Sequence, residues 1–449
     1  MMRKVPIAVH FNKFNGGHAV QNKFWRYVLP SMASQMLTGF FIIVDGFFIG
    51  QRMGDVGLAA VNILWPIAAI IQATGLGLGS GGSVLLASAL GAKNEEKAMR
   101  ARGNALLFLG AASIFLTVVL WFTYPWILQW LGAQGELYAP AEEYVQVIIL
   151  CCAAQVLNSG VNPLLRGAGR TFLAMSGMVM GLLCNIFLDW LFIMPLNWGM
   201  RGAALATVLA QLLSALFQLV CLVSQKEHPM RAAQFIPSFS LMRRLVITGL
   251  SPFGLSLSAS ILILFNNWQC LRWGGQSAVA IYAILSYLLG SLQPLLTGIG
   301  EGMQPLCSYC RGAGDEAGLR RLLLRGLRLV ILFSTVLCAA SILLRQWIPP
   351  LFGASETTAA GADFAIICAA LSLPLWGVVR LFSSYFYATH QTKRSLLFIF
   401  GDPLVISPLC LYLLPLFAKL DGVWLAAPVA QVILVVLLGT MLWRNKVAH

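Results

Sequence analysis

Charged residues are scarce in this chain. Only 10% of its 449 residues are charged, whereas soluble domains carry roughly 25%. Hydrophobic residues make up 59%, and the mean hydropathy is +0.80. A soluble protein could not bury so much apolar surface, so the composition excludes that class. The apolar runs are long enough for membrane-spanning helices rather than for the strands of a barrel.

Residues that usually build an enzyme site are also few. The five histidines are terminal or near loops and do not cluster, which argues against a membrane enzyme. The glycine run at residues 75–82 follows no strand of a βαβ unit, and the chain has no Walker lysine motif. We therefore expect no enzymatic activity, no nucleotide or other cofactor, and no direct use of ATP.

Cysteine pairs are missing from the expected external loops. The ten cysteines are scattered, mostly within apolar segments, and fit small apolar fillers. Cys307 and Cys310 have CxxC spacing, but the motif occurs once and no histidine is near. The N-terminal residues 1–28 are too polar for the apolar region of a signal peptide. We expect the first apolar segment to be a retained helix.

Twelve apolar segments are long enough to cross a bilayer, and they predict an all-α integral membrane protein. The second, eighth and tenth exceed the roughly 20 residues that a span needs, so we expect them to be tilted, bent or extended. The segments are 29–50, 58–90, 103–123, 139–162, 171–193, 202–224, 246–270, 277–306, 323–344, 359–386, 395–417 and 421–443.

The net charge of +14 reflects membrane topology rather than nucleic-acid binding. With the N-terminus placed in the cytoplasm, 24 of the 30 Lys and Arg residues fall on the cytoplasmic side and five outside. Such an excess sets the orientation of membrane proteins. We therefore predict a multi-pass protein of the cytoplasmic membrane with both termini in the cytoplasm.

The two halves of the chain resemble each other at a nearly constant offset. The matches are Met53-Gly54 with Trp273-Gly274, Gly77-Leu-Gly79 with Gly298-Ile-Gly300, Gly91-Ala92 with Gly312-Ala313, Pro195 with Pro415, Gly202 with Gly422, and Ala210-Gln211 with Ala430-Gln431, at offsets of 220 or 221. A six-helix unit has thus been duplicated, which predicts two lobes related by a pseudo-two-fold axis along the membrane normal.

The repeat predicts the domain boundaries. They are a cytoplasmic segment (1–28), an N-lobe with helices 1–6 (29–224), a cytoplasmic linker (225–245), a C-lobe with helices 7–12 (246–443) and a tail (444–449).

The chain resembles the multidrug and toxic compound extrusion (MATE) family, of the DinF-like type, over essentially its whole length. The residues that carry the resemblance are Pro30, Val44-Asp45-Gly46 and Phe48-Ile49-Gly50 in the first segment, Gly54 with Leu58-Ala59-Ala60 after it, Gly91-Ala92, Leu165 to Gly169, Asn185 to Asp189, and Gly202-Ala203-Ala204. The resemblance implies a cation-coupled antiporter that works by alternating access.

Four polar side chains fall at similar depths in the outer leaflet of the predicted N-lobe. Asp45 lies about five residues from the outer end of its segment, Asp189 about four and Asn185 about eight, while Thr207 is about five residues into its own segment. At 1.5 Å per residue these levels agree within about one turn. Two carboxylates, an amide oxygen and a hydroxyl can bind a monovalent cation such as Na⁺ or hold a proton.

The resemblance assigns the same four residues to the cation-coupling site, since an acid in helix 1, Asn and Asp in helix 5 and Thr in helix 6 form it in DinF-like transporters. Other branches of the family carry an acid in helix 7, where this chain reads Asn266-Asn267-Trp268-Gln269-Cys270. Coupling through the C-lobe is therefore not expected. The alternative is that the N-lobe acids are buried and satisfied by the backbone without a transport role.

Aromatic residues and inner-leaflet charges supply further candidates. Phe40, Phe41, Trp65, Tyr144 and Trp376 are candidates for an apolar, cation-tolerant substrate cavity. Near the cytoplasmic side of the C-lobe, Glu301, Arg380 and Asp402 fall at similar depth. We expect Arg380 to pair with one of these acids as an inner gate; the alternative is that each side chain reaches separately to the interface.

The sequence thus favours a monomeric secondary antiporter that exports small organic compounds, cationic or amphipathic, in exchange for H⁺ or Na⁺. Its partners are the bilayer and these substrates, not nucleic acid. The alternative is a flippase for lipid-linked precursors, which needs a more basic cavity than Arg380 alone provides.

Overall fold

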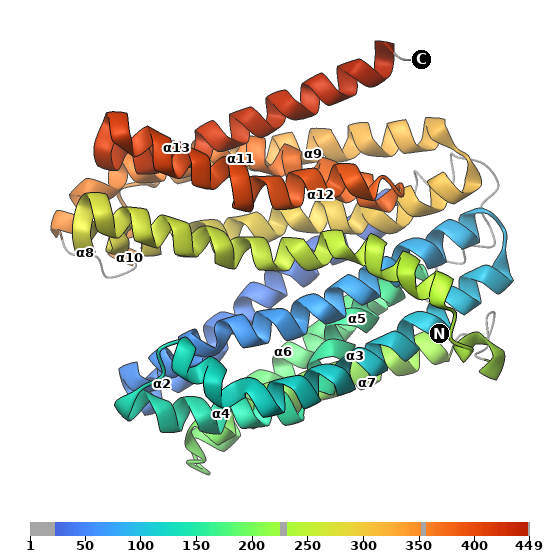
Figure 1. Cartoon of the computed structure of the whole chain (residues 1–449), viewed down its shortest axis with the longest axis horizontal. Coiled ribbons are helices and arrows are strands. Elements are labelled where there is room, and N and C mark those ends of the chain that lie inside the picture. Colours follow the sequence, from blue (N-terminus) through green and yellow to red (C-terminus); the bar gives the residue numbers. More distant parts are fainter. Residues whose placement is uncertain (1–22, 225–230, 352–355, 448–449) are drawn as a thin grey trace, which may run out of the picture. The chain divides into compact units, whose positions relative to one another are not determined.

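The computed structural model describes residues 23–224, 231–351 and 356–447. Helices account for nearly all of these residues, and no strand occurs among them, which confirms the predicted all-α class (Figure 1). The chain divides into two compact units. The first comprises residues 1–256 and 305–319, and the second comprises residues 257–304 and 320–449.

The first unit contains eight complete helical elements and both ends of a long one. They are α2 (Phe24–Gly91), α3 (Glu95–Trp130), η2 (Gly135–Leu137), α4 (Tyr138–Leu150), α5 (Cys152–Gly167), α6 (Thr171–Ile193), α7 (Gly199–Val223), η3 (Ala232–Phe235) and the ends of α8 (Phe239–Ala313). The predicted linker is thus shorter in the structure, since α8 already begins at Phe239.

The second unit holds the central part of α8 and six further elements. These are α9 (Glu316–Leu343, whose first turn belongs to the first unit), α10 (Ile348–Leu351), α11 (Glu356–Ala388), α12 (Thr392–Gly401), the π-helix η4 (Asp402–Ile406) and α13 (Ser407–Val447).

Ten helical stretches in the described part of the chain are long and apolar enough to cross a membrane, or eleven if one bent pair is counted as a span. One of the ten, Thr392–Trp443, is 52 residues long and contains a break at Lys419. At 1.5 Å per residue it is about twice as long as one span requires. The twelve predicted segments therefore all fall on helix.

The predicted fourth segment is not one straight helix. The chain bends by 58° between Leu150 and Cys152, which separates α4 from α5. A bend frees backbone carbonyls, and in lipid these need another donor. The Gln155 side-chain amide supplies one, since its Nε2 donates to the Ile148 carbonyl over 3.1 Å.

The backbone conformation repeats between the two halves even at positions where the residues differ. Four pairs of positive-φ residues are separated by 220 or 221 positions: Gly54 with Gly275, Lys93 with Gly314, Gly169 with His390 and Gly199 with Lys419. Gly54 (φ 60°, ψ −152°) and Gly275 (φ 64°, ψ −155°) interrupt their helices with nearly the same conformation. In three pairs one member is not glycine and still keeps the turn, so residue identity alone does not reveal the repeat.

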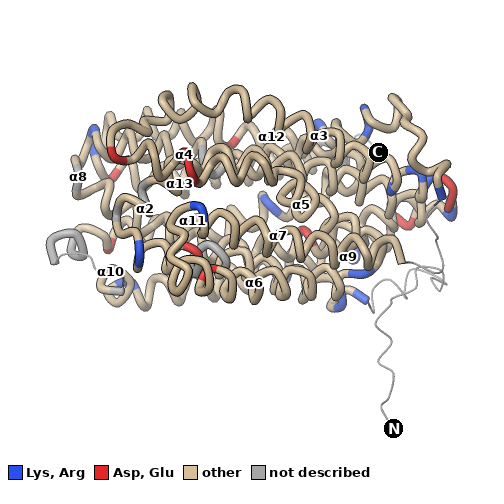
Figure 2. Tube along the Cα trace, turned by 90° about the horizontal axis from the view of Figure 1, so that it is seen from below, with Lys and Arg blue, Asp and Glu red and all other residues tan. Residues whose placement is uncertain are grey.

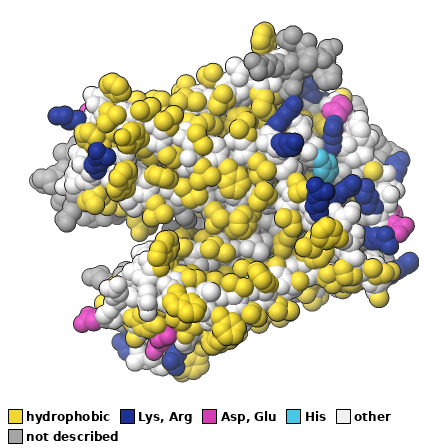
Figure 3. Space-filling model, viewed as in Figure 1, with side chains coloured by type: hydrophobic (Ala, Val, Ile, Leu, Met, Phe, Trp, Pro, Cys, Tyr) yellow, Lys and Arg dark blue, Asp and Glu magenta, His cyan; other side chains and the backbone are white. Residues whose placement is uncertain are grey.

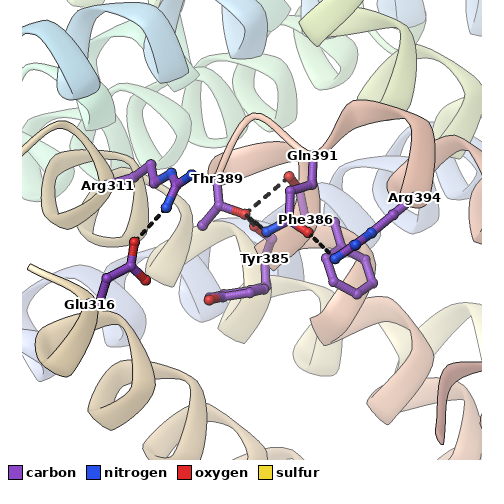
Figure 4. A network of polar contacts seen from close by, with 7 residues as sticks. All are labelled: Arg311, Glu316, Tyr385, Phe386, Thr389, Gln391 and Arg394. Carbon is purple, nitrogen blue, oxygen red and sulfur yellow. Dashed lines mark hydrogen bonds and ion pairs between the residues drawn. The ribbon is translucent and has the colours of Figure 1, made fainter. Parts of the chain in front are cut away.

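One of these repeated turns joins α11 to α12 and is held by side chains (Figure 4). Gln391 donates through Nε2 to the Thr389 hydroxyl (3.3 Å), and Arg394 donates to Oε1 of Gln391 (2.6 Å). The Thr389 hydroxyl in turn donates to the Tyr385 carbonyl over 2.8 Å. These contacts stabilise the positive φ of His390, which a residue with a Cβ atom adopts only at a cost. In the first unit, Arg311 forms an ion pair with Glu316.

Most charged residues lie near the ends of the helices. Lys and Arg residues gather near the helix ends, and few charged residues lie along the middle of the helices (Figure 2). Hydrophobic side chains cover much of the face shown in Figure 3, whereas Lys and Arg side chains are most frequent toward its right-hand end. This distribution is expected when the middle of each helix lies in hydrocarbon and the ends reach the headgroups.

Within the first unit, α2 packs closely against both ends of α8 because glycines remove the side chains between them. A Cβ atom on Gly249 would lie 2.2 Å from the Gly77 carbonyl oxygen. Another on Gly91 would lie 2.0 Å from the Tyr309 carbonyl oxygen. The contact recurs in reverse 221 residues later, since Gly312 lies against the backbone of Ser88.

A buried asparagine of α3 binds the chain segment that joins the two halves. The Asn104 Nδ2 donates to the carbonyls of Gln234 (3.0 Å) and Ile236 (3.2 Å), and its Oδ1 accepts from the Ser238 amide (3.0 Å). Asn104 is 1% exposed, so these bonds form away from water. They hold η3 and the start of α8 in place.

We expect Asn104→Ala to destabilise the first unit by about 1–3 kcal/mol, because it leaves buried backbone groups without their partner. The apparent melting temperature in detergent should fall clearly below that of Asn62→Ala, which removes an exposed asparagine. Equal melting temperatures for the two variants would show that the Asn104 contacts contribute nothing to stability.

Candidate functional site

Asp45 meets Thr207 inside the first unit. Asp45 lies on α2, nine residues before the break at Gly54, and is 8% exposed. The Thr207 hydroxyl on α7 donates to Oδ1 of Asp45 over 3.1 Å. Thr207 is 6% exposed. The bond joins the first span of the chain to α7, across 162 positions of sequence.

Asp189 and Asn185 bring α6 to the same place. They belong to the buried stripe Gly177, Gly181, Asn185, Asp189, whose members are four residues apart and therefore share one face of the helix. Both polar side chains are 0% exposed. In the described part of the chain, neither Asp189 carboxylate oxygen has a hydrogen bond of ordinary geometry, and neither does the Asn185 side-chain amide.

Tyr144 of α4 completes the group. Its ring is 7% exposed, and its hydroxyl interacts with the Thr207 side chain and, through its charge distribution, with both Asp45 and Asp189. The two carboxylates also interact with each other. Four helices that are distant in sequence, α2, α4, α6 and α7, thus place five polar side chains together.

This cluster contains the four residues that the sequence predicted as a cation-coupling site, together with Tyr144. What the sequence did not indicate is the pair of contacts at the neighbouring helix ends. Arg52 donates to Asn197 over 3.0 Å, and Arg201 lies 3.8 Å from Glu143, one residue before Tyr144. Both contacts join residues far apart in sequence, and neither belongs to a recognisable motif. Binding of a cation at the cluster stays a prediction.

The donor set fits a small cation. Two carboxylates, the Asn185 amide oxygen and the Thr207 hydroxyl offer the oxygen ligands that hard cations prefer. The carboxylate and amide atoms without hydrogen bonds are available to such an ion. A proton shared by the two carboxyl groups would satisfy the same need, because two like charges in a low-dielectric site do not both ionise easily.

Comparison with known proteins decides the family. The MatE family model matches residues 30–191 and 252–411. The chain belongs to the MATE family. This finding confirms the family recognised from the sequence motifs, and it makes the protein a multi-pass membrane transporter.

Curated relatives of this MATE protein include the multidrug export proteins MepA of Staphylococcus saprophyticus (23% identical) and Staphylococcus aureus (24% identical). Each alignment covers 89% of this chain and 88% of the relative. Two solved structures share its fold at 23% identity. One is a MATE protein in complex with MaL6, with a TM-score of 0.90 over 97% of this chain and 99% of that one. The other is an outward-facing MATE multidrug resistance transporter, with a TM-score of 0.89 over 96% of both chains.

The aromatic residues predicted for the substrate cavity of this MATE protein are of two kinds. Phe40 and Trp65 are 52% and 42% exposed, as side chains facing a cavity or lipid would be. Tyr144 is buried in the carboxylate cluster, and Trp376 is buried in the second unit. The Phe41 side chain lies outside the described residues. A cavity role for these aromatic residues stays a prediction.

The predicted inner charges lie in the second unit and are all buried: Glu301 is 8% exposed, Arg380 7% and Asp402 1%. Arg380 lies over the ring of Trp376, with 5.1 Å from its Cζ to the ring centroid, and interacts electrostatically with Asp402. Asp402 also accepts hydrogen bonds from Ser407 (2.6 Å) and Gln431 (3.3 Å). Of the two acids, Asp402 is therefore the better candidate partner for Arg380.

Asp402 lies where α12 changes to the π-helix η4. Pro403 follows it and has no amide hydrogen, so the carbonyl of Ile399 four residues earlier lacks its helical partner. The Ser258 hydroxyl donates to that carbonyl over 3.1 Å. The local widening of the helix thus has an identified cause, and its freed carbonyl is satisfied.

We expect Arg380→Glu to impair transport, because it places a second negative charge beside Asp402. Adding Asp402→Arg should restore part of the efflux rate, whereas adding Glu301→Arg should restore less. A matched control is Arg272→Glu, which removes an exposed arginine that lies over Trp268 and Trp273.

Equal efflux from Arg380→Glu and from the combined Arg380→Glu/Asp402→Arg protein would show that the two residues do not act as a pair. Efflux assays on variants with matched membrane expression make this comparison.

Proposed function

We propose that this MATE protein is a secondary antiporter that exports organic cationic or amphipathic compounds, coupled to inward movement of H⁺ or Na⁺. The family membership supports the transport class, and the names of the MepA relatives support multidrug export. The single observation that carries the coupling is the buried cluster of Asp45 and Asp189 with Thr207 and Tyr144.

The cluster couples transport through charge. When a proton or Na⁺ is bound, the two carboxylates are neutralised and the cluster remains stable in a low-dielectric surrounding. When the cation leaves, two negative charges remain close together, and the free energy of this arrangement rises. The helices that carry them, α2 on one side and α6 and α7 on the other, then favour a different packing. Cation occupancy thus selects between two conformations.

Substrate export follows from the same preference. A cationic compound is favoured by the unneutralised, negatively charged state and disfavoured once the coupling cation has bound. The coupling cation and the compound are therefore exchanged across the membrane rather than carried together in one direction. The flippase alternative requires several basic side chains for a lipid-linked phosphate. Arg380, the arginine predicted within a span, lies over the ring of Trp376 and interacts electrostatically with Asp402.

We expect Asp45→Asn and Asp189→Asn each to lower gradient-driven efflux at least tenfold, because an amide neither binds a proton at neutral pH nor supplies a charged ligand. The measurement is efflux of ethidium from proteoliposomes under an imposed pH gradient and, separately, under an imposed Na⁺ gradient. The matched control is Asp363→Asn, which removes an acid that lies 3.5 Å from Arg345 outside the cluster.

The control should retain native rates. Near-native efflux by either cluster variant, at matched protein content, would refute the coupling role of the two acids. The gradient that drives the native protein identifies the coupling cation.

A further inference from the structure

The buried stripe of α6 does not end at the carboxylate cluster. From Asp189 it continues through Asn185 to Gly181 and Gly177, each four residues apart and all buried. The stripe runs about 18 Å along the helix. It therefore leads away from the cluster toward the opposite end of α6, which is cytoplasmic in the predicted topology.

A polar row on α7 faces this stripe. Thr207, Gln211, Ser214 and Gln218 are spaced four, three and four residues apart, so they lie along one side of the helix. The glycines of α6 lie directly against this row. A Cβ atom on Gly181 would lie 3.1 Å from Cβ of Ser214, and one on Gly177 would lie 2.5 Å from Cγ of Gln218.

Hydrogen bonds connect Ser214 and Gln218, the two members of the row that lie farthest from the carboxylate cluster, to each other and to neighbouring helices. Gln218 donates through Nε2 to the Ser214 hydroxyl (3.0 Å) and to Oδ1 of Asn158 on α5 (3.3 Å). Ser214 donates to the Gly177 carbonyl over 2.8 Å. Helices α5, α6 and α7 pack together around these groups (Figure 1).

Several polar atoms along this row have no hydrogen bond of ordinary geometry in the described part of the chain. They are the two carboxylate oxygens of Asp189, Nδ2 and Oδ1 of Asn185, and Oε1 of Gln211 and of Gln218. Asn185, Asp189 and Gln218 are 0% exposed. Buried polar atoms without partners are costly, and in proteins they are normally satisfied by internal water.

We propose that the α5–α6–α7 interface holds a hydrated polar track along which the coupling proton passes between the Asp45–Asp189 cluster and the cytoplasmic end of the first unit. This inference rests on the proposed function, and it deepens it by assigning the proton as the coupling ion and giving it a route. A proton leaves a carboxyl group to a water molecule, and each following water accepts one proton and passes another on.

Close packing makes the track selective. Between Gln211 and Gln218 the helices approach so closely that a single added Cβ atom would clash at Gly177. A hydrated Na⁺ ion does not fit between groups at such distances, whereas a proton needs only a file of single water molecules. The same constriction prevents a free proton leak, because water must be admitted there before a proton can pass.

Charged and titratable groups face the track at its two ends. At the outer end these are Asp45 of α2, Tyr144 of α4 and Asp189 of α6. Near the other end, Arg170 donates to the Cys221 carbonyl over 3.0 Å, and Arg102 of α3 donates to the Leu222 carbonyl over 3.5 Å. Arg166 of α5 is buried on the same helix as Asn158. These carbonyls are the negative end of α7, which favours the arginines there.

Packing alone gives a different expectation. Glycines let membrane helices approach, and polar side chains join them, without any water being involved. In that case the interface is dry, and replacing Gln218 by an apolar residue of similar size costs stability only. The two accounts differ in water access to residue 214 and in the response of proton coupling to Gln218.

The first experiment measures water access. The full-length protein carrying Ser214→Cys is exposed to hydroxyl radicals that X-rays generate from water, and oxidation of residue 214 is followed by mass spectrometry. The control is Ser113→Cys on α3, a hydroxyl position that is 2% exposed and bonded to the Gly110 carbonyl. We expect the thiol at 214 to react at least tenfold faster than the thiol at 113, and Gln218→Met to remove this difference. Equal rates at the two positions would overturn the proposal.

The second experiment measures coupling in proteoliposomes under a pH gradient. Gln218→Met should slow ethidium efflux at least fivefold and raise the solvent isotope effect in D₂O, with ethidium affinity within twofold of native. Gln218→Asn, which keeps an amide, should stay within twofold of the native rate. The matched control, Gln155→Met, removes a buried amide that donates to the Ile148 carbonyl, outside the proposed track. Native rates for Gln218→Met, or an isotope effect equal to that of Gln155→Met, would overturn the proposal.

Failure of the track and failure of the proposed function are distinguishable. If Asp45→Asn abolishes coupling while Gln218→Met does not affect it, the carboxylate site stands and the track is wrong. If Asp45→Asn and Asp189→Asn both leave coupling intact, the proposed function itself fails. The labelling rate at residue 214 is independent of both results, because it needs neither substrate nor gradient.

Discussion

The cost of placing charge in hydrocarbon governs this protein. Each intramembrane acid opposes insertion by roughly 2.5–3.5 kcal/mol, so an acid in a span must be neutralised or given partners. Asp402 has Ser407, Gln431 and the charge of Arg380. Asp45 accepts a hydrogen bond from Thr207, and Asp189 accepts none of ordinary geometry from the described residues. Protein groups thus satisfy Asp402 of the second unit, whereas the carboxylate pair of the first unit has fewer hydrogen-bond donors.

This difference is notable because the two halves share a backbone plan. The paired breaks at Gly54 and Gly275, and the paired turns at Gly169 and His390, show that both halves fold by the same rules. The carboxylate pair occurs in one half only. Position 185, an asparagine at the cluster, corresponds to Val405 after the offset of 220, and Asp189 corresponds to Leu409. The residues predicted to couple the cation therefore lie in the first copy.

Hydropathy and charge asymmetry were sufficient to predict the all-α membrane fold and the region of every span, because bilayer thickness and backbone hydrogen bonding leave few alternatives. Helix depth and the family resemblance grouped Asp45, Asn185, Asp189 and Thr207, which the structure brings together. The bend before Cys152 was not predicted. It depends on Gln155 bonding to Ile148, and side chains that satisfy a broken helix leave no periodic signal. The hydrogen bonds of Asn104 were not predicted for the same reason, since its partners are backbone groups 130–134 positions away.

If the carboxylate pair couples transport, the coupling cation and the substrate must compete for the same state of the pair. Isothermal titration of ethidium into purified protein, repeated in buffers of different ionisation enthalpy and with and without Na⁺, counts the ions released on binding. We expect the native protein to release protons when ethidium binds, or Na⁺ if Na⁺ is the coupling ion. The Asp45→Asn/Asp189→Asn double variant should release neither ion. Ethidium binding to the native protein without release of either ion, or equal release by the double variant, would contradict it.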